Sequence, residues 1–532
     1  MAALSQAQSA EHAAITLPPR IPMPSIIYGT AWKGPASQPL VLTALRAGFR
    51  ALDTSAQLKH YDEAAVGEGV RDALTAAASD PDLHGLTRSQ LWIQTKCTPP
   101  AGQDWSRPVP YKRTDRPAIA VRKSFAASLW NLATDQAWRE AHPPPPNSAQ
   151  RGSLDLKGKG RDLTGSDAAS GGGDNLSPLE VLSDAAVSLL PGQQAANATA
   201  QVGPQYPDEG SILLPHLRPR TSASEPYIDS YLLHSPFDSL EDIIEAWREM
   251  ENLVRLGWIR RIGLSNVYDP RILQLLRGYM VTTPSQTFDH GQSAQSIPTY
   301  PIAPTILQNR WHNSTLHDVS LFSILSPTLS PNDFADVAGR ISSQKPSADE
   351  ALAALRAKLA SPSDQLEAPE PDTDDPTQVQ PMTYQAFWIL TGNPTLLTKS
   401  SILESVQILN AYLPQSISPP VPAREPLTAL QQAVLSVRWT PQMLVYATVA
   451  LGLGGVPGLS TSVLCGSTDQ THMVEALVAV YRAEALRAAE TGIRPPWIQK
   501  NPLGPKERER EEAHNVALRD AVDAIRKIVY GE

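Results

Sequence analysis

The chain of 532 residues has only two cysteines, no long apolar run and no excess of positive charge. Cys97 and Cys465 are too few for a disulfide framework, and they show no spacing typical of a metal site. No stretch approaches the roughly 18 uninterrupted apolar residues of a membrane-spanning helix. The formal net charge of -9 argues against nucleic acid or an anionic membrane as the main partner. We therefore expect a protein of the cytoplasm, without a metal site.

Proline is abundant but unevenly spread, with 49 residues in the chain. Residues 1–20 lack a basic region followed by an apolar run, so we expect a flexible leader and no signal peptide. Two tracts, 133–226 and 325–380, are rich in Pro, Gly, Ser or acidic residues and have no period that could bury a face. They are predicted to be long, largely disordered insertions, with one plausible helix in each, over 179–190 and 348–359.

Outside these tracts, short apolar runs alternate with amphipathic segments. The predicted strands are 25–28, 49–52, 91–96, 227–234, 259–266, 305–309, 383–388 and 462–467. The predicted helices are 39–47, 64–77, 118–132, 240–256, 270–276, 441–451, 471–488 and 506–529. Eight such units favour a parallel sheet closed into a (β/α)8 barrel over an open doubly wound sheet. Residues 21–490 would form this single domain, followed by a C-terminal loop and charged helix over 491–532.

Three residues give the boundaries of helices a physical basis. Gly48 and Gly257 follow helical segments at the position where a left-handed residue commonly ends a helix. Ser239 precedes a helix and has Asp242 three residues later, as in a capping box.

Polar and aromatic side chains stand where the predicted strands end. In chain order the ends read Thr30-Ala31-Trp32, Asp53, Lys96, His234, Ser265-Asn266, Gln308-Asn309, Phe387-Trp388 and Gly466-Ser467. Active sites of (β/α)8 barrels lie at the C-terminal ends of the strands. Charge at a strand end is costly in a core and useful in a site, so we predict that these residues meet.

Five segments around these ends resemble motifs of the aldo-keto reductase superfamily, in the same order. They are Phe49–Thr54 for "GYRxxDTA", Val66–Gly69 for "EVG", Gln94–Lys96 for "TK", Tyr227–Pro236 for "YIDLYLIHxP" and Arg261–Val267 for "RxIGVSNF". One such motif is weak evidence, but five in order argue against chance and against a different fold. The resemblance covers the barrel and neither insertion. It implies reduction of an aldehyde or ketone by hydride transfer from NADPH or NADH.

The resemblance implies four catalytic residues, Asp53, Tyr61, Lys96 and His234. The chemistry requires the same residue types, because negative charge grows on the carbonyl oxygen and must be met by a donor and a proton. A tyrosine with an ordinary pKa of about 10 needs a nearby ammonium to favour its phenolate, and a carboxylate to hold that ammonium. We therefore expect Tyr61 as the proton donor, supported by Lys96 and Asp53, with His234 orienting the carbonyl.

The tyrosine position has two candidates. Tyr61 follows Asp53 by eight residues, whereas the family pattern places tyrosine five residues after the aspartate. Asp62-Glu63 resembles the family's "NE", and that register would place His60 on the tyrosine position. An insertion of two or three residues in this loop explains either alignment. We favour Tyr61 because imidazole is a poorer proton reservoir for this step, and His60 stays open.

The resemblance also implies the cofactor contacts. Ser265, Asn266 and Gln308 would bond the nicotinamide carboxamide, and Phe387 would stack on its ring. The remaining predicted cofactor residues are Thr30, Ala31, Asp53, Gly466, Ser467, His472 and Glu475. At the last strand the family often has Lys-Ser followed by Arg, which bind a 2′-phosphate, where this chain has Gly466-Ser467 and His472. NADPH is the family default, but the missing cation leaves NADH open as well.

Trp32 and Trp311 are predicted to flank the mouth of the barrel and to line a flat, apolar site for the carbonyl substrate. Two other functions remain open. A cofactor-binding barrel could serve as a regulatory or scaffolding subunit, with protein partners at the insertions. Alternatively, the insertions themselves could be the functional part around a structural barrel. A tyrosine within reach of Lys96 would distinguish a reductase from a regulatory subunit, because a regulatory subunit has no need of one.

Overall fold

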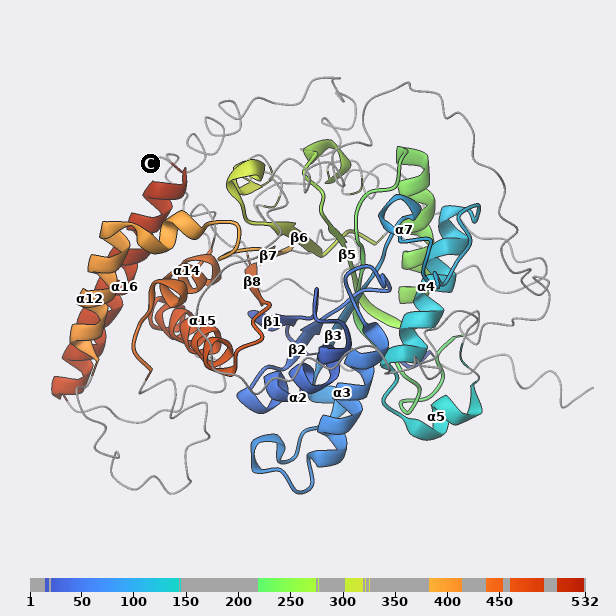
Figure 1. Ribbon diagram of the computed structural model, residues 1–532, viewed down its shortest axis with the longest axis horizontal. Helices are drawn as coiled ribbons and strands as arrows, with labels where there is room; N and C mark the ends of the chain where they lie inside the picture. The colour runs from blue at the N-terminus through green and yellow to red at the C-terminus, as the bar shows by residue number, and fades with distance from the viewer. Residues whose placement is uncertain are drawn as a thin grey trace, which may run out of the picture.

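The computed structural model describes residues 15–18, 21–142, 219–273, 302–318, 382–413, 437–452, 460–491 and 505–530, and the single positions 144, 276, 321 and 325. Most of both predicted insertions lies outside the described residues, as do the helices predicted over 179–190 and 348–359. Eight strands form a closed barrel at the centre of the molecule (Figure 1). The (β/α)8 barrel predicted from the sequence is confirmed.

All neighbouring strands are parallel, and β8 pairs with β1 to close the barrel. The strands are β1 (Ile26–Gly29), β2 (Ala51–Asp53), β3 (Trp92–Cys97), β4 (Ile228–Leu233), β5 (Ile259–Ser265), β6 (Ile306–Arg310), β7 (Thr383–Phe387) and β8 (Ser460–Cys465). β3 and β4 are buried at every residue, as expected for parallel strands between a packed interior and a layer of helices. Each strand lies within two residues of its predicted bounds.

Helices surround the barrel (Figure 1). They are α2 (Ser37–Ala47), α3 (Glu63–Ala76), α4 (Pro117–Leu132), α5 (Gln136–Ala141), α7 (Leu240–Arg255), α12 (Ser400–Tyr412), α14 (Pro441–Ala450), α15 (Gln470–Thr491) and α16 (Pro505–Tyr530). Short 3-10 helices are η1 (Gly34–Ala36), η2 (Pro81–Leu83), η3 (Arg88–Gln90), η4 (Pro100–Gly102), η7 (Asn313–Asp318) and η8 (Pro394–Thr398). None of the helices in the described ranges is long and apolar enough to cross a membrane.

The predicted helix ends are confirmed. Gly48 and Gly257 have φ angles of 117° and 81°, a region that an L side chain enters only with strain. The Ser239 hydroxyl accepts a hydrogen bond of 3.1 Å from the backbone N–H of Asp242 at the start of α7. At Gly67, within α3, a side chain is excluded by close packing, since a Cβ there would lie 2.0 Å from the carbonyl oxygen of Asn131. Its missing side chain lets α3 lie directly against the end of α4.

Two parts of the described chain differ from the sequence-based expectation. Within the range predicted as the first insertion, α5 forms and Arg220 is only 1% exposed. The Arg220 guanidinium donates hydrogen bonds to the carbonyl oxygens of Thr16 and Glu225, which anchors the chain ahead of β4. Helix α12 was not predicted, although Ile402, Val406 and Leu409 have helical spacing and are buried. It packs against α16 beside the barrel (Figure 1).

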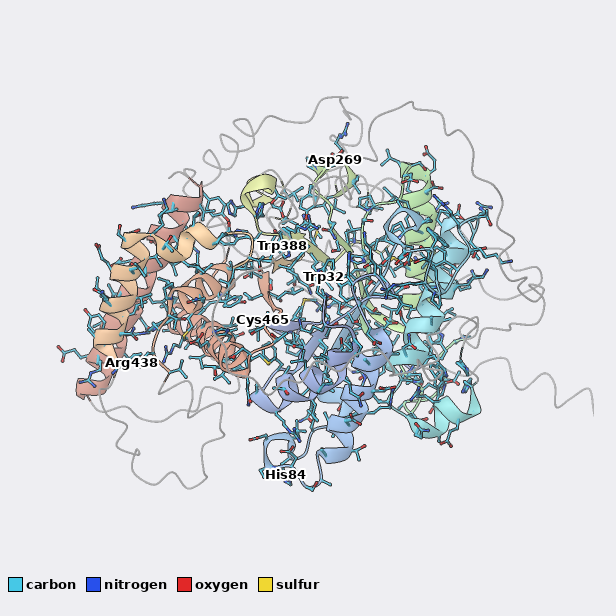
Figure 2. The ribbon with its side chains drawn as sticks, viewed as in Figure 1. Trp32, His84, Asp269, Trp388, Arg438 and Cys465 are labelled. Carbon is cyan, nitrogen blue, oxygen red and sulfur yellow. The ribbon has the colours of Figure 1, made fainter. Side chains whose placement is uncertain are left out.

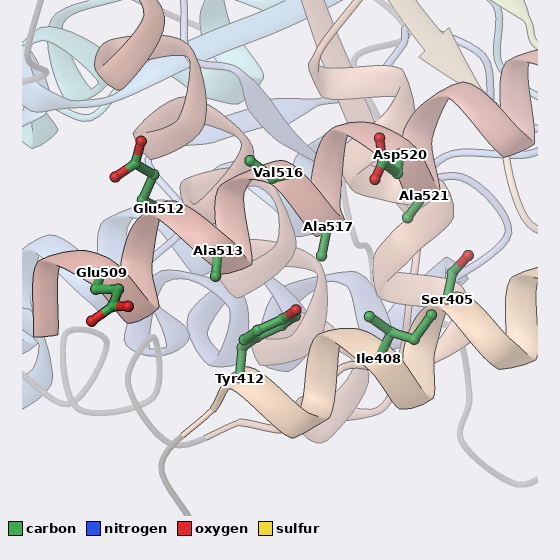
Figure 3. A pocket seen from close by; sticks show the side chains of 10 residues that line it. All are labelled: Ser405, Ile408, Tyr412, Glu509, Glu512, Ala513, Val516, Ala517, Asp520 and Ala521. Carbon is green, nitrogen blue, oxygen red and sulfur yellow. The ribbon is translucent and has the colours of Figure 1, made fainter. Parts of the chain in front are cut away.

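A groove of about 490 Å³ runs between α12 and α16, away from the strand ends (Figure 3). Its lining is apolar with three carboxylates, and consists of Ser405, Ile408, Tyr412, Glu509, Glu512, Ala513, Val516, Ala517, Asp520 and Ala521. The polar residues predicted to carry chemistry lie elsewhere, at the C-terminal ends of the strands.

Candidate active site

A buried ion pair stands at the ends of β2 and β3. The Lys96 ammonium lies 2.6 Å and 2.8 Å from the two carboxylate oxygens of Asp53. It also donates to the Thr54 carbonyl oxygen at 3.0 Å. Lys96 is 0% exposed and Asp53 2% exposed, so each charge depends on the other to offset its lost hydration. Burial lowers the pKa of Lys96, and the charge of Asp53 opposes that shift.

Three glutamines fix the Asp53 carboxylate from below, inside the barrel. Oδ1 of Asp53 accepts hydrogen bonds from the side-chain amides of Gln94 at 2.8 Å and Gln308 at 3.1 Å. The same two amides donate to Oε1 of Gln385, at 2.7 Å and 2.9 Å. Because β3, β6 and β7 all contribute, the position of the carboxylate is set by several strands at once. The sequence had not marked Gln94 and Gln385 for this role.

Tyr61 lies directly against this ion pair. The Lys96 ammonium is 5.2 Å from the centroid of the Tyr61 ring. The ring also meets that of His234 edge-on, with centroids 5.7 Å apart. Burial is the main cause that raises the pKa of Tyr61, the Asp53 charge raises it further, and the Arg310 charge lowers it. The phenol therefore keeps its proton at neutral pH.

His60 has different neighbours. Its ring lies tilted by 37° against that of Trp32, with centroids 3.8 Å apart. The His60 carbonyl oxygen accepts a 2.6 Å hydrogen bond from the backbone N–H of Trp32. Trp32 follows β1 with a φ of 63° and is 73% exposed. Figure 2 shows Trp32 and Trp388 over the strands of the barrel. The role of Trp32 in lining a substrate site stays a prediction.

His234 follows β4 and is held through one ring nitrogen. Its Nδ1 lies 2.7 Å from the hydroxyl of Thr98 and 3.1 Å from that of Ser55. Burial lowers the pKa of His234 well below its ordinary value, and the charges of Lys96, His60 and Arg310 act in the same direction. The imidazole is therefore neutral, and with Nδ1 engaged by the two hydroxyls its Nε2 can face a ligand. Ser55 and Thr98 were not predicted as site residues.

The residues predicted to bind a carboxamide form one contiguous group. The side-chain amide of Asn266 donates to the His234 carbonyl oxygen at 2.9 Å and to the Ser265 hydroxyl at 3.3 Å. The Ser265 hydroxyl in turn donates to Oε1 of Gln308 at 3.4 Å. Asn266 adopts a φ of 53°, which turns the chain at the end of β5. Phe387 ends β7 on the adjoining wall and is half-buried.

A cation that the sequence did not predict joins the ends of β1 and β8. The Lys33 ammonium donates to the carbonyl oxygens of Gly466 at 2.9 Å and Ala31 at 3.3 Å. It lies 5.4 Å from the centroid of the Tyr28 ring, whose hydroxyl donates to the Ser467 carbonyl oxygen at 3.0 Å. A Cβ on Gly466 would be 3.9 Å from this ammonium. Lys33 therefore brings a positive charge next to Gly466, at the position where the family often has a lysine.

The remaining predicted cofactor residues surround the same end of the barrel. The Thr30 hydroxyl donates to the Asp53 carbonyl oxygen at 2.9 Å, tying β1 to β2. His472 is exposed in the first turn of α15, and its backbone N–H donates to the Asp469 carboxylate at 3.1 Å. Burial is the main cause that raises the pKa of Glu475, one turn further on. The Asp469 backbone N–H also donates to the Ser467 hydroxyl at 3.0 Å, and the Asp469 charge acts on Glu475.

The prediction for Trp311 is wrong. This side chain is 0% exposed, and its indole N–H donates to the Tyr530 hydroxyl at 3.1 Å. The ring also packs edge-on against His317, with centroids 4.8 Å apart. The chain turns outward after β6, so Trp311 packs under the end of α16 and cannot line the mouth. A strand-end position alone did not show on which side of the wall the side chain would lie.

Arg310, one residue earlier, is the side chain on β6 that the prediction omitted. Its guanidinium carbon lies 4.7 Å from the centroid of the Trp388 ring and 6.0 Å from that of Phe387. Its charge lowers the pKa of both Tyr61 and His234. Its position in the sequence could have indicated this role, because Arg310 directly follows Gln308-Asn309 at the predicted end of the sixth strand.

Comparisons with known proteins show what part of this chain is similar to. A model described as "Aldo/keto reductase family" matches residues 223–286, which include β4 and β5. The NADPH-dependent alpha-keto amide reductase of Saccharomyces cerevisiae is 50% identical over 44 residues, 8% of this chain and 14% of that protein. Methylglyoxal reductase DkgA of Yersinia pestis is 29% identical over 93 residues, 17% of this chain and 29% of that protein. The alignments thus span less than a third of either relative.

Similar solved structures are also aldo-keto reductases by title. MGS-M4, an aldo-keto reductase from a deep-sea metagenome library, is 13% identical, with 93% of both chains covered and a TM-score of 0.37. Aldose reductase from Giardia lamblia is 13% identical, with 93% of this chain and 92% of that chain covered and a TM-score of 0.37. The family match over residues 223–286 confirms the resemblance of this chain to the aldo-keto reductases.

Proposed function

We propose that this protein is an NAD(P)H-dependent reductase that converts an aldehyde or ketone to an alcohol. The observation that carries the proposal is the contact of the Tyr61 ring with both the buried Lys96 ammonium and the His234 ring, at the C-terminal ends of the strands. A regulatory barrel would have no use for an acid, a cation and an imidazole in this arrangement.

Each residue has a separate task. Tyr61 donates its proton to the carbonyl oxygen, and the Lys96 ammonium stabilises the phenolate that remains. Asp53 keeps the ammonium in place, and the hydrogen bonds from Gln94 and Gln308 hold Asp53 in turn. The neutral His234 donates from Nε2 to the same carbonyl oxygen, which orients the substrate and shares its growing charge.

We propose Tyr61 over His60 as the proton donor on the basis of these contacts. The His60 ring packs against the exposed Trp32 at the rim, whereas the Tyr61 ring lies against Lys96. The longer loop after Asp53 thus places the tyrosine at the ion pair three residues later than the family pattern does.

A nicotinamide cofactor supplies the hydride when it is bound. The contiguous Ser265, Asn266 and Gln308 offer the donors and acceptors that a carboxamide needs, and the half-buried Phe387 offers a flat face beside them. Further contacts come from Thr30, Ala31, Gly466, Ser467, His472 and Glu475. We propose NADPH as the preferred form, with Lys33 supplying the positive charge at the loop after β8.

We propose that the substrate is a small carbonyl compound and that the protein acts in the cytoplasm. The exposed Trp32 provides an apolar wall at the mouth. Cys97 and Cys465 are both buried free thiols, which supports a reducing compartment.

The test is consumption of NADPH and of NADH with a panel of aldehydes and ketones. Wild type should oxidise the cofactor only when a carbonyl is present. Tyr61→Phe should lower the turnover rate by at least about 100-fold while it still binds the cofactor. His60→Ala should keep the turnover rate of the wild type. Unchanged activity in Tyr61→Phe would refute the assignment of the donor. Cofactor binding without turnover of any carbonyl would instead favour a regulatory subunit.

A further inference from the structure

Arg310 holds a guanidinium at the mouth of the barrel with aromatic neighbours and, among the described residues, no ion pair with a carboxylate. It stands at the end of β6, two residues after Gln308 and opposite Phe387 in the register of β7. The rings of Trp388 and Phe387 lie 4.7 Å and 6.0 Å from its guanidinium carbon. Trp388 has a φ of 61°, which turns the chain at the end of β7 where its ring meets the guanidinium.

Three other partly buried arginines have carboxylate partners. Arg88 and Arg260 both pair with Asp229, and Arg122 pairs with Glu249. Within the described ranges, none of the ion pairs includes Arg310, and its Nε atom is buried with no hydrogen-bond partner. Burying this N–H group without an acceptor is unfavourable. An anionic group of a bound ligand would supply the missing partner.

We propose that Arg310 binds a carboxylate of the substrate, so that the preferred substrates are oxo acids with the reacting carbonyl close to the carboxylate, such as 2-oxo acids. This inference rests on the proposed reductase function. The planar guanidinium matches a carboxylate through two parallel hydrogen bonds, and the aromatic rings on its face leave its N–H edge available. The carbonyl carbon gains a hydride from the reduced cofactor, its oxygen gains the proton of Tyr61, and the carboxylate is unchanged.

The same charge also acts on the catalytic groups, because it lowers the pKa of Tyr61 and of His234. That effect is common to every substrate. A contact with a carboxylate affects only the substrate that carries one. A matched pair of acid and ester therefore separates the two effects within one variant.

The test compares phenylglyoxylate with its methyl ester in the wild type, Arg310→Met and Arg310→Lys. Arg310→Met should lower the ratio of kcat/KM for the acid to kcat/KM for the ester by about 10- to 100-fold. Arg310→Lys should retain part of the ratio, because it keeps the charge but loses the paired hydrogen bonds. Arg261→Met is the control, since Arg261 also lies over a tryptophan ring, 5.7 Å from Trp92, but near the start of β5. It should leave the ratio unchanged.

A binding measurement separates this inference from the reductase function. Phenylacetate and phenylacetamide have the same shape and lack a reducible ketone, so calorimetry with the cofactor-loaded protein reads only the anion site. Wild type should bind the acid more tightly than the amide, and Arg310→Met should lose that preference. Equal losses for acid and ester in the kinetic test, or no preference for phenylacetate in the wild type, would overturn the inference and leave the reductase proposal intact. A preference for phenylacetate without any turnover would refute the reductase proposal alone.

Discussion

The Lys96 ammonium lies 2.6 Å from a carboxylate oxygen of Asp53, and both side chains are almost completely buried. Removing one partner of a buried pair leaves an uncompensated charge, which costs about 3–5 kcal/mol of stability. Asp53→Asn should therefore lower the free energy of unfolding by about this amount. Lys96→Met should lower it by less, because the amides of Gln94 and Gln308 still donate to the remaining carboxylate.

Urea denaturation of both variants tests this ranking. The control is Arg46→Met, which removes a surface pair with Asp80 whose arginine side chain is 42% exposed, and should cost less than about 1 kcal/mol. A larger loss in Lys96→Met than in Asp53→Asn would show that the glutamines do not support the carboxylate.

The sequence predicted most of the fold because it repeats one unit eight times and places polar residues where apolar runs stop. Asp53, Lys96 and His234 could be found in this way, since a strand end fixes both their position and their neighbours. Tyr61 could be placed only in a loop, and its register against His60 depended on a turn that no local pattern specifies.

The rest depended on contacts between distant segments. Lys33 is bonded to Gly466, which lies 433 positions later in the chain. The placement of Trp311 also depended on a distant segment. Its indole N–H donates to the hydroxyl of Tyr530, at the end of the last helix. Arg310 was visible in the sequence, but its lack of an acidic partner among the described residues is a property of the folded barrel.

Lys33 should determine the preference between the two nicotinamide cofactors. Its ammonium donates to the Gly466 carbonyl oxygen in the loop after β8, where Asp469 adds negative charge ahead of Glu475 in α15. Lys33→Met should raise the dissociation constant for NADPH by about tenfold, or ~1.4 kcal/mol, and change that for NADH much less. Titrations of both cofactors by protein fluorescence measure this difference.

The matched control is Lys399→Met, an exposed lysine before α12, which should change neither dissociation constant. An equal loss for NADPH and NADH in Lys33→Met would mean that the lysine only ties β1 to β8. In that case the 2′-phosphate would have no partner in Lys33.

Asp318 should make the protein less stable at alkaline pH. Burial raises its pKa to about 7 from an ordinary value of 3.8, and the Tyr384 hydroxyl donates to its carboxyl group at 2.5 Å. Between these values the folded state binds more protons than the unfolded state, so stability is lost as the pH rises through about 7. Asp318→Asn should remove this loss and raise Tm at pH 8 relative to the wild type.

Thermal melts between pH 5 and pH 8 measure the effect. Asp523→Asn on α16 is the control, because its carboxylate is 59% exposed and should leave the pH profile of Tm unchanged. A wild-type profile parallel to that of Asp318→Asn would contradict the assignment.

His514 should act in the opposite direction and weaken the protein in acid. The indole N–H of Trp439 donates to Nε2 of His514 at 3.0 Å, which requires that this nitrogen carry no proton. Burial lowers the pKa of His514 to about 4 from an ordinary value of 6.5, with a smaller contribution from the charge of Arg482. The unfolded state therefore takes up a proton first, and the stabilisation present above pH 6.5 is lost as the pH falls toward 4.

His514→Gln keeps an acceptor for Trp439 without a group that titrates in this range. Its Tm should fall less than that of the wild type between pH 7 and pH 4.5, with the two profiles closest at neutral pH. His84→Gln is the control, since His84 is exposed beside η2, far from α16 (Figure 2). It should follow the wild-type profile throughout. If His514→Gln followed the wild type as well, protonation at the contact between Trp439 and α16 would not be the step that destabilises the protein in acid.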